Sequence, residues 1–191
     1  MQMLRDYFKG FGSLPHDEMD FLLSQCTTKE LKKGGVLIPP NHHVDSIYFL
    51  ESGYLHYFTY TELGERVTLK VVSPNICWTI LDSFMNQTPA EDECVALTDV
   101  RFCELKRSNY FAIKDKSKSL SDFINRIIEQ ILSLKVIEAN NKSKMTVEER
   151  YLDLLQKNPE MVREVPISII ASLIGTSRET LHRIRRRLTA A

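Results

Sequence analysis

Residues 170–188 read IASLIGTSRETLHRIRRRL, and this stretch decides which fold we expect. An apolar run ends at Gly175, and glycine is the residue that most often follows the last turn of a helix. Ser177 can cap a second helix, in which apolar residues recur at spacings of three and four. The stretch therefore predicts two helices joined by a tight turn, which is the arrangement of a helix-turn-helix.

The second of these helices has a basic outer face, because five of the fourteen residues at 175–188 are arginines. Arginine forms paired hydrogen bonds with guanine, glutamate accepts one from cytosine, and hydroxyl groups bond phosphates. The alternative is an ordinary amphipathic helix with solvated arginines, since cations favour a helix C-terminus. The residues that we expect to contact DNA are Ser177, Arg178, Glu179, Thr180, His182, Arg183, Arg185, Arg186 and Arg187.

The formal net charge of zero hides an uneven distribution. Residues 1–141 hold 15 lysines and arginines against 19 acids, whereas residues 142–191 hold 10 against 6. A basic end beside an acidic body favours a polyanion that docks at that end. The four cysteines lack the spacing of a metal or iron–sulfur site, so we expect free thiols and no metal.

Residues 33–75 are rich in β-branched and aromatic residues, and turn-forming residues interrupt them at short intervals. This texture predicts the short strands of an all-β roll, sandwich or barrel, with a hairpin tip at Gly64. Further strand-like runs occupy residues 76–81, 94–97 and 100–105. Before this region, residues 14–31 are predicted to be helical, because Pro15 and two acids suit a first helical turn.

Residues 120–140 predict a long helix, followed by a polar hinge at 140–144 and a capped helix start at Thr146 with Glu149. We expect the flank of the long helix to pack on the β region and its heptad seam to meet a second copy. The alternative is a helix wholly buried within one chain. The seam consists of Leu120, Ile124, Ile127, Ile131 and Leu134.

The β region, the long helix and the C-terminal motif together resemble the Crp/Fnr family of bacterial transcription regulators, most closely in SRETLHR at residues 177–183. The resemblance implies an α+β fold. An antiparallel β-roll of the cyclic-nucleotide-binding type would occupy residues 1–118, a dimerisation helix residues 119–141, and an all-α helix-turn-helix residues 142–191.

The same resemblance implies what these parts do. Arg178, Glu179 and Arg183 would read bases, and Ser177 and Thr180 would contact the DNA backbone. The homodimer would bind a near-palindromic operator in the cytoplasm, with RNA polymerase as a further partner. Relatives commonly continue into a β-wing after the recognition helix, whereas this sequence ends three residues after Leu188, like short regulators of the Bacteroidetes type.

The nucleotide-binding signature of the family is missing from this sequence. Trp78 and Thr79 stand where the family has Gly-Glu, and Glu91 and Asp92 stand near the position of the phosphate-binding arginine. No lysine or arginine lies between Lys70 and Arg101, and the two carboxylates would repel a phosphate. We therefore expect that the protein binds no cofactor and no cyclic AMP. The region around these four residues is a candidate binding site for an effector whose identity is unknown.

Two other functions compete with a DNA-binding regulator. One is a cyclic-nucleotide-binding-like module that regulates a protein partner, which the C-terminal motif disfavours. The other is an enzyme built on a cupin-like β domain, which would need clustered histidine and carboxylate ligands. His42 and His43 are adjacent and would point to opposite faces of a strand, so we do not expect an enzyme. No apolar run is long enough to span a bilayer, and we expect a soluble protein.

Overall fold

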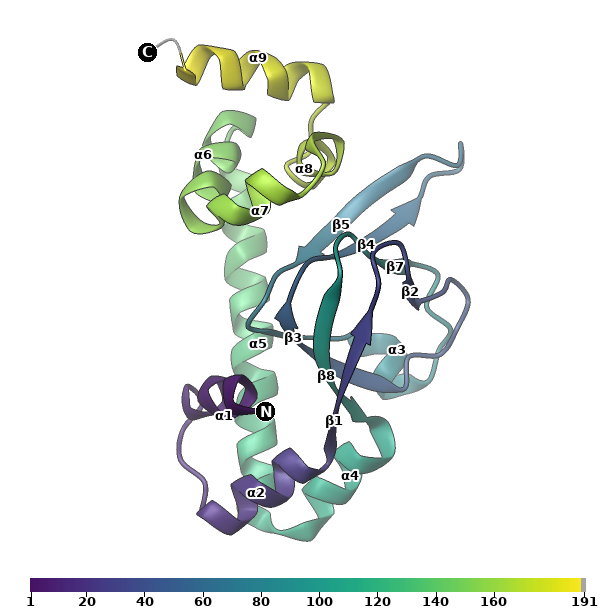
Figure 1. Cartoon of the computed structure of the whole chain (residues 1–191), viewed down its shortest axis with the longest axis vertical. Helices are drawn as coiled ribbons and strands as arrows, with labels where there is room; N and C mark the ends of the chain where they lie inside the picture. The colour runs from purple at the N-terminus through teal and green to yellow at the C-terminus, as the bar shows by residue number, and fades with distance from the viewer. Residues whose placement is uncertain (190–191) are drawn as a thin grey trace.

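The computed structural model describes residues 1–189, except for the side chains of residues 134–135 and 137–143. A long helix, α5 (Lys118–Lys144), runs along the molecule and joins three parts (Figure 1). A helical base consists of α1 (Gln2–Lys9), α2 (His16–Ser24) and α4 (Arg107–Lys116). The β-roll lies beside the middle of α5, and four short helices gather at the far end.

The β-roll consists of two four-stranded antiparallel sheets. The first has the order β1 (Cys26–Leu31), β8 (Val100–Lys106), β3 (Ser46–Ser52), β6 (Ile76–Trp78). The second has the order β2 (Val36–Ile38), β7 (Glu93–Ala96), β4 (Leu55–Tyr60), β5 (Arg66–Val72). A short helix, α3 (Leu81–Asn86), follows β6. The predicted α+β class and β-roll are confirmed.

Two tight turns of the roll depend on glycine. Gly64 has a φ of +78° at the tip of the β4–β5 hairpin, where the sequence predicted a turn. Gly53 has a φ of +80°, and a Cβ atom there would lie 2.3 Å from the Asp99 carbonyl oxygen. A larger residue at position 53 would therefore both strain the backbone and collide with the neighbouring strand.

Three hydrophobic clusters hold the chain together. One lies inside the roll, and a second packs the outer face of the β1–β8–β3–β6 sheet against α1, α2, α4 and α5. The third joins α6 (Val147–Lys157), α7 (Pro159–Glu164), α8 (Ile167–Leu173) and α9 (Arg178–Thr189) to the roll through Tyr54 and Val71. The predicted capping box at the start of α6 is confirmed, because Thr146 and Glu149 exchange both hydrogen bonds.

The heptad seam of α5 does not face outward as predicted. Leu120, Ile124 and Ile127 are at most 7% exposed, because they pack on the roll and the base of their own chain. Ile131 is partly buried against the same cluster, and the side chain of Leu134 lies outside the described residues. Among the described side chains of α5, the exposed large apolar ones are instead Leu132 (41%) and Val136 (60%).

Two further expectations were wrong. Residues 26–31 form strand β1 and not the end of a helix, because all six pair with residues 100–105 of β8. The predicted hinge at residues 140–144 is helical, because α5 continues without a break to Lys144. Helices α1, α3, α4 and α7 were not predicted. Among the residues that the structure describes, no helix is long and apolar enough to cross a membrane.

Candidate nucleic-acid interface

The turn between α8 and α9 closes by two backbone hydrogen bonds. The Thr176 N–H donates to the Ala171 carbonyl (2.9 Å), and the Gly175 N–H donates to the Ser172 carbonyl (3.0 Å). This pattern needs a left-handed residue, and Gly175 supplies it with a φ of +76°. Arg150 of α6 donates to the Ile174 carbonyl (3.0 Å), so a neighbouring helix fixes the turn in place.

The first turn of α9 is capped by Ser177, as the sequence predicted. Its hydroxyl accepts a hydrogen bond from the Thr180 backbone N–H (3.2 Å). The same hydroxyl donates to the Thr180 hydroxyl (3.2 Å), which also accepts from Arg183 (3.2 Å). These bonds hold two hydroxyl groups and one guanidinium group together at the start of the helix.

The inner face of α9 fixes which side chains point outward. Leu181 and Ile184 are buried among Tyr151, Ile170 and Ile174 of α6, α8 and the turn. Because one helix face is occupied in this way, the opposite face must be exposed. The exposed residues of α9 are Arg178, Glu179, His182, Arg183, Arg185, Arg186, Arg187 and Thr189.

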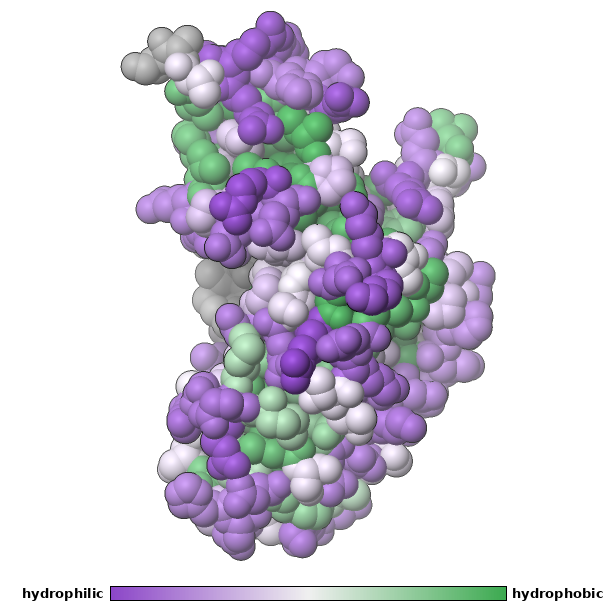
Figure 2. Space-filling view, in the orientation of Figure 1, coloured by the Kyte–Doolittle hydropathy of each residue, from purple (hydrophilic) through white to green (hydrophobic). Residues whose placement is uncertain are grey.

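This outer face lies at one end of the molecule, and Figure 2 shows a hydrophilic surface over it. Glu179, His182, Arg183 and Arg186 line a shallow concavity there. Hydrogen bonds from its own backbone N–H and from Ser177 lower the pKa of Glu179 below its ordinary value. The helix therefore presents a carboxylate that accepts hydrogen bonds beside guanidinium groups that donate them.

Two predicted contact residues are already engaged within the chain. Arg187 forms an ion pair with Glu148 of α6, whose carboxylate offsets its charge. The Arg178 side chain donates to His182 (3.5 Å). The sequence could not indicate the first pair, because its members lie 39 positions apart.

The interior of the roll is filled by side chains of the chain itself, both aliphatic and aromatic. Tyr48 stacks on Trp78 with ring centroids 6.5 Å apart, and Tyr57 meets Trp78 edge-on at 5.2 Å. Phe102 packs against Tyr48 in the same cluster. Among the described residues no lysine or arginine is buried. A phosphate placed in this interior would therefore find no compensating cation.

Of the four residues predicted to surround an effector, Trp78 and Thr79 line one cavity, whereas Glu91 and Asp92 do not belong to its lining. Trp78 belongs to the aromatic core of the roll, while the Thr79 hydroxyl donates to the Ser46 carbonyl (2.9 Å). Asp92 accepts a hydrogen bond from the Tyr57 hydroxyl, and Glu91 is exposed. Burial and the neighbouring Asp92 carboxylate together raise the pKa of Tyr57.

The roll also contacts the helix-turn-helix directly, which the sequence did not indicate. The Thr68 backbone N–H of β5 donates to the Ser172 hydroxyl of α8 (2.9 Å). Behind it, the His56 ring nitrogen Nε2 and the Thr68 hydroxyl lie 2.9 Å apart. Polar contacts therefore connect β4 and β5 of the roll with the first helix of the motif.

Comparisons with known proteins agree with this architecture. Residues 28–117 match the family model of the cyclic nucleotide-binding domain. No curated protein matched the sequence.

Solved structures match over almost the whole chain. The c-di-GMP responsive global regulator CLP of Xanthomonas campestris is 18% identical, with a TM-score of 0.68 and coverage of 92% of each chain. A putative cyclic nucleotide binding protein of Ruegeria pomeroyi is 20% identical, with a TM-score of 0.68, and covers 93% of this chain and 81% of its own.

The Catabolite Activator Protein of Thermus thermophilus is 21% identical, with a TM-score of 0.56, and covers 94% of this chain and 86% of its own. Identities this low are informative about fold and not about ligands or targets. The chain therefore shares its fold, over nearly its whole length, with the catabolite activator protein, and its residues 28–117 match the cyclic nucleotide-binding domain family.

Proposed function

We propose that this chain is a sequence-specific DNA-binding transcription regulator of the Crp/Fnr type, acting as a homodimer. The observation that carries the proposal is the outer face of α9, where Arg178, Glu179, Arg183 and Arg186 are exposed on a helix whose other face is buried. A helix of this kind fits the major groove with its N-terminal residues against base edges. RNA polymerase is the further partner expected of such a regulator. The regulator itself would be located in the cytoplasm.

The roles of the residues follow from their positions. Arg178, Glu179 and Arg183 lie in the first half of α9 and would read bases. Ser177 and Thr180 would contact the DNA backbone, and Arg185 and Arg186 would neutralise phosphates farther along the helix. Arg187 would contribute less, because Glu148 already neutralises it. Residues 142–191 would thus form the DNA-binding part, and residues 1–118 the regulatory part.

The dimer would form through α5, but not through the seam expected from the sequence. Leu132 and Val136 are exposed on the half of the helix nearer the DNA-binding end. Pairing of two copies along this half would bury both side chains and place two α9 helices on successive half-sites of a near-palindrome.

Cyclic AMP is not the effector in this proposal. The aromatic filling of the roll and the missing cation both disfavour a buried cyclic phosphate. A cyclic-nucleotide-binding module that acts on a protein partner is the competing function, and it would not need an exposed recognition helix.

The test is selection of binding sites from a random duplex library at near-physiological salt, with and without cyclic AMP. The expected result is the same near-palindromic motif in both conditions. A motif that appears only with cyclic AMP would overturn the account of the roll. Recovery of no motif, together with weak binding that is lost steeply with salt, would contradict sequence-specific regulation.

A further inference from the structure

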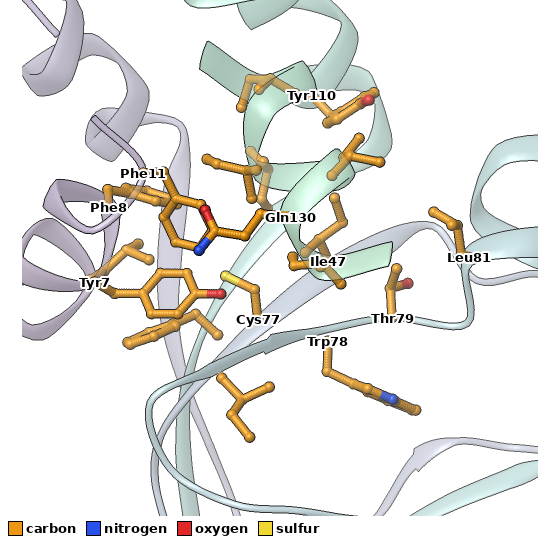
Figure 3. Close-up of a pocket in the computed structure, with 18 of the residues that line it drawn as sticks. Tyr7, Phe8, Phe11, Ile47, Cys77, Trp78, Thr79, Leu81, Tyr110 and Gln130 are labelled. Atoms are coloured by element: carbon orange, nitrogen blue, oxygen red, sulfur yellow. The ribbon is translucent and has the colours of Figure 1, made fainter. Parts of the chain in front are cut away.

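A cavity lies between α1, the outer face of the β1–β8–β3–β6 sheet and α5 (Figure 3). Its volume is about 470 Å³, which falls in the range of small-molecule sites. It reaches below the surface, because the almost fully buried Leu4, Phe84 and Tyr110 line it. Trp78 and Thr79 also line it, so the cavity borders the aromatic interior of the roll at β6.

The lining is mostly apolar, with few polar groups. The Tyr7 hydroxyl points at the Cys77 thiol across the cavity, and the Gln130 side chain lies near Tyr7 and Phe11 (Figure 3). Burial raises the pKa of the Cys77 thiol to about 12, so the thiol remains protonated near neutral pH. Since the thiolate is the reactive form, the cavity is suited to reversible binding and not to covalent capture.

The charges around the cavity favour an anionic ligand. Among the residues whose side chains the structure describes, the lining contains no aspartate or glutamate, and Lys70 is its one charged residue. Among the residues that the structure describes, Lys70 forms no ion pair. A ligand with an apolar tail and a carboxylate head would leave the tail in the cavity and place its charge toward Lys70.

A narrow ligand fits this space better than a second protein chain does. The deep part is enclosed by α1 and the sheet of the same chain, with Leu4 and Phe49 among its walls. A helix with side chains is about 10–12 Å across and would reach only the mouth. An extended acyl chain can instead enter between the packed elements.

We propose that this cavity binds an amphipathic carboxylate, such as a medium-chain fatty acid, and that it is the effector site of the protein. Ile127 and Ile131 of α5 belong to its wall, so an occupant contacts the helix that leads to the DNA-binding end. The binding itself stands on the cavity alone, whereas its role as effector site rests on the proposed DNA-binding function.

The test is equilibrium dialysis of the full chain against radiolabelled decanoate, with decylamine as the matched cationic competitor. We expect saturable binding of one decanoate per chain, displaced poorly by decylamine. Trp78, the single tryptophan, is the neighbour of Cys77 in β6, so its fluorescence should change with the same saturation curve.

Three variants locate the site. Gln130→Phe places a ring at the exposed entrance near Tyr7 and should abolish saturable binding without affecting the fold. Lys70→Gln should weaken decanoate binding by about twofold to fivefold, as expected for a partly exposed ion pair. Lys106→Gln removes an exposed lysine outside the lining and should change nothing.

The outcomes separate the two proposals. A chain that binds selected DNA but shows no saturable decanoate binding overturns the inference and leaves the proposed function intact. Binding that is unchanged in both Gln130→Phe and Lys70→Gln overturns it as well. A shift of oligomeric state in Gln130→Phe without any decanoate binding would show that a second copy covers the cavity. A chain that binds decanoate but no DNA supports the cavity and contradicts the proposed function.

Discussion

Arg186 and Arg187 are neighbours on α9, yet their surroundings differ. Arg186 is exposed beside Arg183 and His182, whereas Arg187 is paired with Glu148. A guanidinium group that replaces counterions on a phosphate contributes about one unit to the salt dependence of DNA binding. A group already neutralised by a carboxylate releases fewer ions.

Arg186→Ala should therefore weaken DNA binding evenly across sequences and reduce the slope of log K against log salt by about one. Arg187→Ala is the matched control and should leave that slope nearly unchanged. Fluorescence anisotropy of a labelled duplex at several salt concentrations measures both. Equal slopes in the two variants would show that the ion pair with Glu148 does not prevent Arg187 from contacting a DNA phosphate.

Residue types predicted which side chains of α9 are exposed, because the periodicity of a helix fixes which side chains share a face. The same reasoning could not find the partner of Arg187, nor the contact between Thr68 and Ser172, because both depend on how distant segments pack. Likewise, Trp78 and Thr79 were noted as departures from a binding signature, but only the structure shows that Trp78 fills the roll.

At the scale of elements, the turn before α9 depends on one glycine. A residue with a Cβ atom costs about 1–2 kcal/mol in the left-handed conformation of Gly175. That Cβ atom would also lie 3.3 Å from the guanidinium nitrogen of Arg150, which fixes the turn. The orientation of α9 should therefore be sensitive to this position.

Gly175→Ala should lower the free energy of unfolding by about 1–2 kcal/mol and weaken DNA binding as well. Gly64→Ala is the matched control, because Gly64 has a similar φ of +78° with open space around it. Gly64→Ala should lower the free energy of unfolding by a similar amount and leave the affinity for DNA unchanged. Chemical denaturation and anisotropy measure the two effects, and equal DNA affinities in both variants would contradict the role of the turn.

Elements with a strong local pattern were predicted, and elements fixed by distant partners were not. The capping box at Thr146 and the hairpin at Gly64 are local signals. Residues 26–31 were wrongly predicted as helix, since their strand form is stabilised by six pairs with β8, about 75 positions away. The seam of α5 was identified as apolar, but periodicity cannot say whether such a face meets its own chain or another.

At the scale of the whole molecule, His56 lies in the connection between the roll and the helix-turn-helix. Burial, and after it the nearby Arg66 charge, lowers the pKa of His56 to about 4 from an ordinary 6.5. Between these two values the unfolded chain binds a proton that the folded chain does not. The contribution of His56 to the free energy of unfolding is therefore fully present above pH 6.5 and is lost as the pH falls toward 4.

His56→Gln should remove this part of the pH dependence while other acid-sensitive groups keep theirs. Thermal melts of both proteins between pH 7.5 and pH 4 measure it, with the difference between them as the readout. A constant difference across that range would show that His56 titrates alike in the folded and unfolded chains.

The dimer proposed here makes a second prediction at this scale. Val136→Glu places a charge on the exposed apolar half of α5 and should shift the chain toward monomer, because a buried unpaired charge opposes association. Leu63→Glu is the control, since Leu63 is 87% exposed at a hairpin tip. Sedimentation equilibrium measures the fraction of dimer in each variant, which should fall in Val136→Glu and stay at the wild-type value in Leu63→Glu. A wild-type chain that is already monomeric on its selected operator would rule out this dimer.

The measurement that tests the central claim most directly is site selection repeated with Arg183→Ala beside the wild type. Arg183 is exposed on α9 and held by Thr180, so it should read one base pair in each half-site. We predict that the variant recovers the same near-palindrome with that base pair relaxed, a loss of about 1–3 kcal/mol of discrimination there. An unchanged motif in the variant, with only a uniform loss of affinity, would contradict base reading by this face of α9.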